Sequence, residues 1–168
     1  MSGPWPVAVS SPVWQSEADD RMMKPNVEPQ AVPPEAVALV PEIEVSDFTR
    51  SLHFYVALLG FSVLYDRPER PFAYLTLGEA HIMIEHGGTW MTGALEQPFG
   101  RGVNLQITVS NVTAIAARLA AEGWPLFRQI EEAWYRRGAE HVGTRELVVQ
   151  DPDGYLLRFS ERLGVREE

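Results

Sequence analysis

The stretch Ile43–Thr49 (IEVSDFT) decides the fold, because it occurs twice in related form. It returns as Ile107–Thr113 (ITVSNVT), and each copy runs into a helix-compatible segment. These two segments close on Gly60-Phe61 and on Gly123-Trp124. A strand-turn-helix unit that occurs twice predicts a duplicated module. We expect a binding cleft along the seam that the two copies share.

The first copy predicts one helix and four strands. Residues 37–45 alternate as a strand, with Ile43 and Val45 on the buried face and Val40, Glu42 and Glu44 on the other. A helix capped by Asp47 follows, and a glycine supplies its left-handed exit. The remaining strands are expected at residues 61–65, 72–77 and 80–85, the last two as a hairpin.

The same order repeats after a Gly-rich linker at residues 87–102. Alternation predicts a strand that buries Val103, Leu105, Ile107 and Val109, followed by a helix capped by Asn111. Residues 125–130 are a further strand candidate, 129–140 a long charged loop, and 145–150 with 155–160 a hairpin around an Asp-Pro-Asp-Gly turn. The predicted fold is therefore α+β, with two tandem βαβββ modules.

Composition sets the domain limits. Residues 1–34 hold seven of the 13 prolines without periodicity, which predicts a flexible Pro-rich tail. We expect the first module with its linker at residues 35–100, the second module at 101–164 and a C-terminal tail at 165–168. Met22 or Met23 is an alternative start of the protein.

Charge and residue usage exclude several classes of function. The formal net charge of −9 argues against nucleic-acid binding and permits a cationic ligand, although surplus acid is equally a solubility device. The absence of cysteine removes disulfides and thiolate metal sites and fits the cytoplasm. The sequence contains neither an apolar run long enough for a membrane span nor a secretory signal. We therefore expect a cytoplasmic protein with neither a membrane nor a nucleic-acid partner.

Several strings together carry a family resemblance. Pro41–Asp47, Ser51–Tyr55 and Leu59–Phe61 resemble the opening of the vicinal oxygen chelate (glyoxalase/bleomycin resistance/dioxygenase) superfamily. Gly100–Asn104, Trp134–Arg136 and Asp151–Phe159 resemble its bleomycin-resistance branch. The resemblance covers residues 36–164. It implies paired βαβββ modules that form a curled-sheet cleft, and a homodimer. Members include glyoxalase, extradiol dioxygenases, fosfomycin-modifying transferases and metal-free antibiotic-binding proteins, so the site must decide the function.

The resemblance also implies four positions at which enzymes of this superfamily hold a divalent metal. They fall on Val40, on Met83 or Glu85, on Asn104 and on Arg158. One carboxylate at most is present, and a permanent cation repels a metal ion. We therefore predict no metal, no cofactor and no catalytic residue; no Ser-His-Asp pattern appears either.

Strand parity and the position of loop aromatics predict the ligand-binding residues. They are Glu42, Glu44, Tyr74, His81, Glu85, Trp90, Asn104, Gln106, Trp134, Tyr135, Glu146 and Arg158. Some of them allow structural alternatives. His81 and Glu85 could approach as a metal pair, an ion pair or a hydrogen bond; Arg158 could neutralise Glu42 or Glu85; and Trp134 could stack on a ligand or close its loop over the core.

The leading hypothesis is a metal-free binding protein of the bleomycin-resistance type. It would sequester a cationic, aromatic, bleomycin-like small molecule in an acidic groove without making or breaking a bond. The alternative is a metal-dependent lyase, isomerase or dioxygenase of the same superfamily, with a rearranged metal site built from Glu42, His81 and Glu85. A third possibility is a module that only mediates protein contacts.

Overall fold

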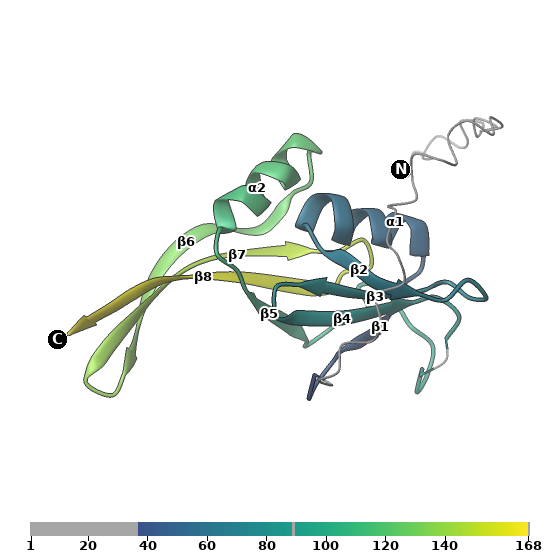
Figure 1. Cartoon of the computed structure of the whole chain (residues 1–168), viewed down its shortest axis with the longest axis horizontal. Coiled ribbons are helices and arrows are strands. Elements are labelled where there is room, and N and C mark those ends of the chain that lie inside the picture. Colours follow the sequence, from purple (N-terminus) through teal and green to yellow (C-terminus); the bar gives the residue numbers. More distant parts are fainter. Residues whose placement is uncertain (1–36, 89, 168) are drawn as a thin grey trace, which may run out of the picture. The chain divides into compact units, whose positions relative to one another are not determined.

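The computed structural model describes residues 37–88 and 90–167, and the predicted tail at 1–34 lies outside them. It contains two four-stranded sheets that do not close, with strand orders β1-β4-β3-β2 and β5-β8-β7-β6 (Figure 1). The predicted α+β fold with two tandem βαβββ modules is confirmed. The elements of the first module are β1 (Glu42–Glu44), α1 (Phe48–His53), η2 (Phe54–Leu59), β2 (Ser62–Asp66), β3 (Phe72–Leu77) and β4 (Ala80–Glu85). Those of the second are β5 (Asn104–Thr108), α2 (Val112–Ala121), β6 (Leu126–Arg137), β7 (Glu140–Gln150) and β8 (Leu156–Glu167).

The first helix begins and ends where the sequence predicts, but it changes type. The Asp47 carboxylate accepts a hydrogen bond from the Arg50 amide at 3.0 Å, and Gly60 ends the helical segment with φ of 87°. Its second half, η2, is a π-helix rather than an α-helix. The strand expected from residue 37 begins only at Glu42, because β4 offers partners to just three residues of β1.

The two modules share one core on the helical side of the sheets. Ile43, Val45 and Ile107 are buried in it, as the alternation predicts. Val103 departs from the prediction: it precedes β5 and is 52% exposed. Leu105 is half-buried.

The hairpin of β6 and β7 corrects the prediction of a charged loop at residues 129–140. Strand β6 runs through this segment and pairs with β7 from Leu126↔Val149 to Arg137↔Glu140. It is an outer edge strand whose two faces are both largely exposed, so its sequence lacks the apolar alternation on which the prediction relied. Strand β8 likewise continues to Glu167, through residues that the sequence analysis placed in a C-terminal tail.

The Asp-Pro-Asp-Gly turn before β8 joins the modules. Its two buried carboxylates bind residues of the first module: Asp151 accepts from the Tyr55 hydroxyl at 3.0 Å, and Asp153 accepts from the Ser46 amide at 3.1 Å. Burial raises the pKa of Asp151 to about 6, against the lowering effect of its hydrogen bonds. The turn is therefore an inter-module joint as well as a hairpin connection.

A second joint connects the helices. The Arg118 guanidinium on α2 donates to the carbonyl oxygens of Leu58 and Leu59 at 2.8 and 2.9 Å. Those carbonyls belong to the last turn of η2, where orphan acceptors and the negative end of the helix dipole favour a cation.

Candidate functional site

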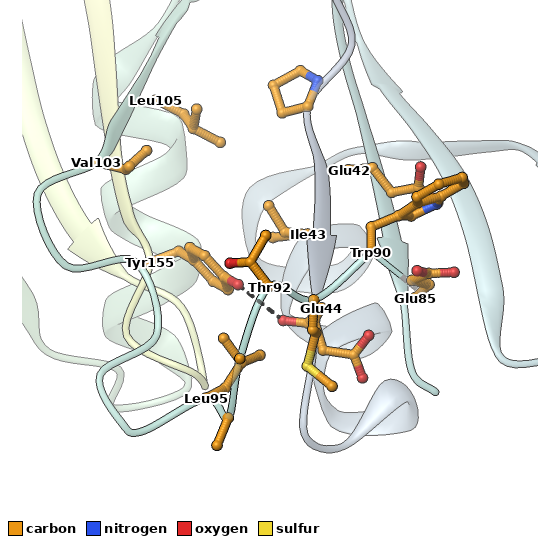
Figure 2. Close-up of a pocket in the computed structure, with 14 residues that line it drawn as sticks. Glu42, Ile43, Glu44, Glu85, Trp90, Thr92, Leu95, Val103, Leu105 and Tyr155 are labelled. Carbon is orange, nitrogen blue, oxygen red and sulfur yellow. Dashed lines mark hydrogen bonds between the residues drawn. The ribbon is translucent and has the colours of Figure 1, made fainter. Parts of the chain in front are cut away.

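A pocket of about 420 Å³ lies between β1 and the start of β5, at the seam of the two modules (Figure 2). Its walls come from β1, the end of β4, the linker and the approach to β5. They are formed by Pro41, Glu42, Ile43, Glu44, Glu85, Trp90, Met91, Thr92, Gly93, Ala94, Leu95, Val103, Leu105 and Tyr155. The pocket thus combines three carboxylates, one indole and an apolar wall.

Glu44 holds the linker in place. Its two carboxylate oxygens accept hydrogen bonds from the amides of Gly87 and Gly88 at 2.9 and 3.0 Å. Both glycines have positive φ, 139° and 72°, which lets successive amides turn toward one anion. Its backbone carbonyl accepts from the Tyr155 hydroxyl at 3.2 Å, the dashed contact in Figure 2. Glu44 is therefore committed to the protein itself.

The negative charge of Glu85 is also balanced by a neighbouring cation. Its carboxylate is 4% exposed and lies 3.6 Å from the Arg70 guanidinium. Arg70 in turn lies over the Phe72 ring, 5.3 Å from its centroid. The loop between β2 and β3 thus brings a cation to the buried end of β4.

Glu42 is the pocket carboxylate that remains available. Within the described residues it makes neither a hydrogen bond nor an ion pair, and it stays partly exposed. Burial, and then the negative charge of Glu85, raise the pKa of Glu42, while Arg70 and Arg67 oppose them. In Figure 2 the side chains of Glu42 and Trp90 lie at the same end of the pocket. Trp90 is 75% exposed, so the face of its indole is open to a ligand.

Tyr74 and His81 lie together on the open face of the first sheet, the face opposite the core. The His81 Nδ1 is 3.1 Å from the Tyr74 hydroxyl, and burial raises the pKa of Tyr74. His81 does not pair with Glu85: its Nδ1 lies beside the Tyr74 hydroxyl, and Glu85, four residues further along β4, pairs with Arg70 from the loop between β2 and β3.

Four predicted residues belong to the open face of the second sheet. The Arg158 guanidinium donates to the Gln106 amide oxygen and lies 3.9 Å from the Glu146 carboxylate, which also accepts from Ser160. Asn104 is exposed at the start of β5. Arg158 therefore does not neutralise Glu42 or Glu85, as the alternative reading held; it pairs within its own sheet.

Trp134 and Tyr135 lie on β6 and not in a loop, which corrects their expected setting. The Arg166 guanidinium lies 3.5 Å from the centroid of the Trp134 ring. On the paired strand, a Cβ added to Gly143 would lie 2.7 Å from that ring. Packing within the hairpin accounts for Trp134, whereas Tyr135 is 54% exposed.

Several pocket residues escape the sequence analysis. Val103 follows the core alternation and so is assigned to the core, although it is exposed at the pocket. Leu105 packs against the core as predicted and also lines the pocket. Met91 and Leu95 lie in a segment without periodicity. The sequence contains a signal for Tyr155, because this aromatic residue directly follows the Asp-Pro-Asp-Gly turn. The turn contains two buried aspartates and fixes the position of the tyrosine that follows it.

The residues present do not fit the metal centre that the superfamily implies. Val40 carries no ligand atom, and the second position falls on Met83 or on Glu85, whose carboxylate already lies beside the Arg70 guanidinium. Asn104 offers a weak carbonyl ligand, and Arg158 is a cation. Across residues 37–88 and 90–167, no three His, Asp or Glu side chains gather as a metal site requires. No helix in the same ranges is long and apolar enough to cross a bilayer.

Comparison with known proteins identifies the superfamily to which this architecture corresponds. The sequence profile of the Glyoxalase/Bleomycin resistance protein/Dioxygenase superfamily matches residues 38–159. A solved member of that superfamily from Vibrio splendidus 12B01 is 35% identical over 74% of this chain and 97% of its own, with a TM-score of 0.35. No significant match was found among curated proteins.

Two further solved structures share the fold at lower identity. TioX from Micromonospora sp. ML1 is 23% identical over 76% of this chain and 100% of its own, with a TM-score of 0.60. Lactoylglutathione lyase from Agrobacterium tumefaciens is 16% identical over 77% and 95%, with a TM-score of 0.51. The profile match over most of the described residues shows that this chain belongs to the glyoxalase/bleomycin resistance/dioxygenase superfamily.

Proposed function

We propose that this protein binds a cationic small molecule with an aromatic ring in the pocket between its modules, and that it does so without chemical conversion. The observation that carries the proposal is the Glu42 carboxylate, partly buried beside Glu85 and without a partner within the described residues. A ligand cation would supply the missing charge. It would also relieve the repulsion between the two carboxylates.

The rest of the pocket suits the remainder of such a ligand. The indole of Trp90 offers a large exposed face for a planar ring or a cation. Val103 and Leu105 supply an apolar wall opposite β1. Glu44 contributes indirectly, because its hydrogen bonds to Gly87 and Gly88 fix the start of the linker that carries the indole.

Within the superfamily, this chemistry favours the bleomycin-resistance type over a metal-dependent lyase, isomerase or dioxygenase. The positions that the superfamily implies for the metal carry Val40, Met83 or Glu85, Asn104 and Arg158. This set holds at most one carboxylate together with a permanent cation, and a divalent cation does not select it. A bleomycin-like molecule, which is amphipathic and cationic, fits an acidic pocket with an exposed indole. A protein that protects the cell by sequestering such a molecule needs to bind it tightly and needs no catalytic group.

Titration with bleomycin tests this proposal through the change in tryptophan fluorescence. We expect a saturable change at micromolar ligand, and a 10- to 100-fold loss of affinity in E42Q, because the variant removes a charge-assisted contact of about 1.5–3 kcal/mol. E79Q is the matched control: Glu79 is exposed in the turn between β3 and β4, outside the pocket. The absence of a saturable change, or equal loss in both variants, would contradict the proposal.

We also propose that the protein acts as a cytoplasmic homodimer. Strand β6 pairs with β7 on one side and is the outer edge of its sheet in the described part of the chain, and it exposes Phe127 (57%), Ile130 (37%) and Tyr135 (54%). Such an edge is stabilised when a second copy covers it. A cysteine-free chain fits a reducing compartment. Sedimentation at tens of micromolar should give the dimer mass, and a monomer there would contradict the dimer.

A further inference from the structure

We propose a second ligand subsite on the open face of the first sheet, formed by Tyr65 and Tyr74, that receives a second planar ring of the ligand whose cation meets Glu42. This inference rests on the proposed function. The preferred ligand would be an elongated cation that carries two ring systems.

One row of side chains connects the two subsites. The register pairs Glu42 with Met83, Met83 with Tyr74, and Tyr74 with Tyr65, so that one residue from each of the four strands contributes. The next residues along β1, β4 and β3 are Ile43, Ile84 and Ala73, and they point into the core. Because neighbouring strands lie about 4.8 Å apart, Tyr74 is about 10 Å and Tyr65 about 14 Å from Glu42 across the sheet.

A β-bulge brings Tyr65 onto this row. The pairing shifts between Val63↔Leu75 and Tyr65↔Tyr74, which leaves Leu64 as an extra residue on β2. In a strand without a bulge, regular alternation would turn Tyr65 to the same face as Val63. Bulges bend a strand locally and redirect a side chain. Here the redirected side chain meets Tyr74 on the open face.

The two rings form a firm platform. Their centroids are 5.1 Å apart with 24° between the planes, which is a stacked arrangement. Tyr65 also contacts the buried Phe72 at 5.9 Å, and the Tyr74 hydroxyl lies at hydrogen-bonding distance from His81. Both tyrosines stay half-buried and take no part in the core. Two stacked rings that are fixed by Phe72 and His81 and remain partly exposed suit a stacked planar guest.

Met83 lies between the two subsites. Its flexible, polarizable side chain occupies the row between Glu42 and Tyr74, where an apolar spacer of the ligand would pass. The row therefore presents a carboxylate, a thioether and two phenol rings in sequence. The matching molecule has a cation at one end, a spacer of about 10 Å and an aromatic group at the other end.

Two cations with the same head group test the second subsite. Pentamidine carries two benzamidinium rings joined by a five-carbon dioxy chain, and 4-pentyloxybenzamidine lacks the second ring together with its charge. Tyrosine variants separate the two contributions, because they remove the ring contact and leave every charge of the protein in place. By calorimetry we expect pentamidine to bind the whole chain about tenfold more tightly than the shorter cation. Y65T and Y74L should each abolish most of this preference and leave the affinity for 4-pentyloxybenzamidine unchanged.

The outcomes separate the two proposals. If neither cation binds, the proposed function fails. If both bind equally well to the unmodified chain, the pocket stands and the second subsite is overturned. Equal weakening of both cations by Y65T would also overturn it. Threonine suits the edge strand on which Tyr65 lies, so this variant keeps the test decisive if Y74L does not fold.

Discussion

Glu42 and Glu44 lie on one face of β1, but their surroundings give them different roles. Glu44 accepts two backbone amides of the linker, whereas Glu42 faces the pocket with no partner among the described residues. Strand parity places both side chains correctly. It could not separate their roles, because Gly87 and Gly88 return to Glu44 from more than 40 positions along the chain.

The raised pKa of Glu42 predicts a pH dependence of ligand binding. A carboxyl group pairs with a cation only when it is ionised, so affinity should fall as the pH drops from neutral through the raised pKa. In that range, binding should release a proton, because the bound cation lowers the pKa again. Calorimetry in buffers of different ionisation enthalpy measures this release. E42Q should show neither the proton release nor the pH dependence, and a persistent slope in E42Q would assign the effect to another group.

The hydrogen bonds of Glu44 predict that its removal weakens ligand binding, although the Glu44 side chain does not contact the ligand. E44A leaves the amides of Gly87 and Gly88 without their acceptor and frees the start of the linker. We expect ligand affinity to fall about tenfold, while the fluorescence of Trp90, compared with a W90F background, shifts toward that of a fully hydrated indole. An unchanged Trp90 spectrum together with weakened binding would mean that Glu44 contacts the ligand directly.

At the scale of elements, local signals predict more than long-range ones. Asp47 and Asn111 cap their helices as expected, because a cap depends on amides three residues away. The edge strand β6 is not predictable from alternation, since its two faces are largely exposed and charged residues occupy them. Tyr65 is missed because one bulge residue reverses the parity of the rest of β2.

The β6–β7 hairpin depends on a close contact between Gly143 and Trp134. Replacing Gly143 by alanine puts a Cβ 2.7 Å from the indole, so the ring must move from its place beneath Arg166. G143A should lower the free energy of unfolding by about 1–3 kcal/mol, measured by urea denaturation. G93A is the control, because nothing lies within 4 Å of a Cβ there. Equal effects of the two substitutions would show that the contact does not matter.

At the scale of the whole molecule, the buried turn before β8 holds the two modules together. Its carboxylates bind Ser46 and Tyr55 of the first module, and Arg118 binds the end of η2 from the second. The sequence predicts a turn at this position from its proline and glycine. It gives no sign that both aspartates are buried, because their partners lie about 100 residues earlier.

The raised pKa of Asp151 predicts how the stability of the folded protein depends on pH. Its folded-state pKa of about 6 lies above its ordinary value of 3.8, so the folded protein binds the proton more tightly than the unfolded chain does. The contribution of this group to stability therefore decreases as the pH rises from about 4 to about 6, by up to about 3 kcal/mol. Thermal denaturation of D151N across this range should lack that component. A parallel pH profile in D151N would contradict the assignment.

The central claim is that the pocket between the modules holds a cation through Glu42, and a crystal structure with bleomycin bound tests it most directly. The account predicts a cationic nitrogen of the ligand within about 4 Å of the Glu42 carboxylate and a planar ring against Trp90. A ligand bound elsewhere, or a metal ion coordinated between the two sheets, would contradict it.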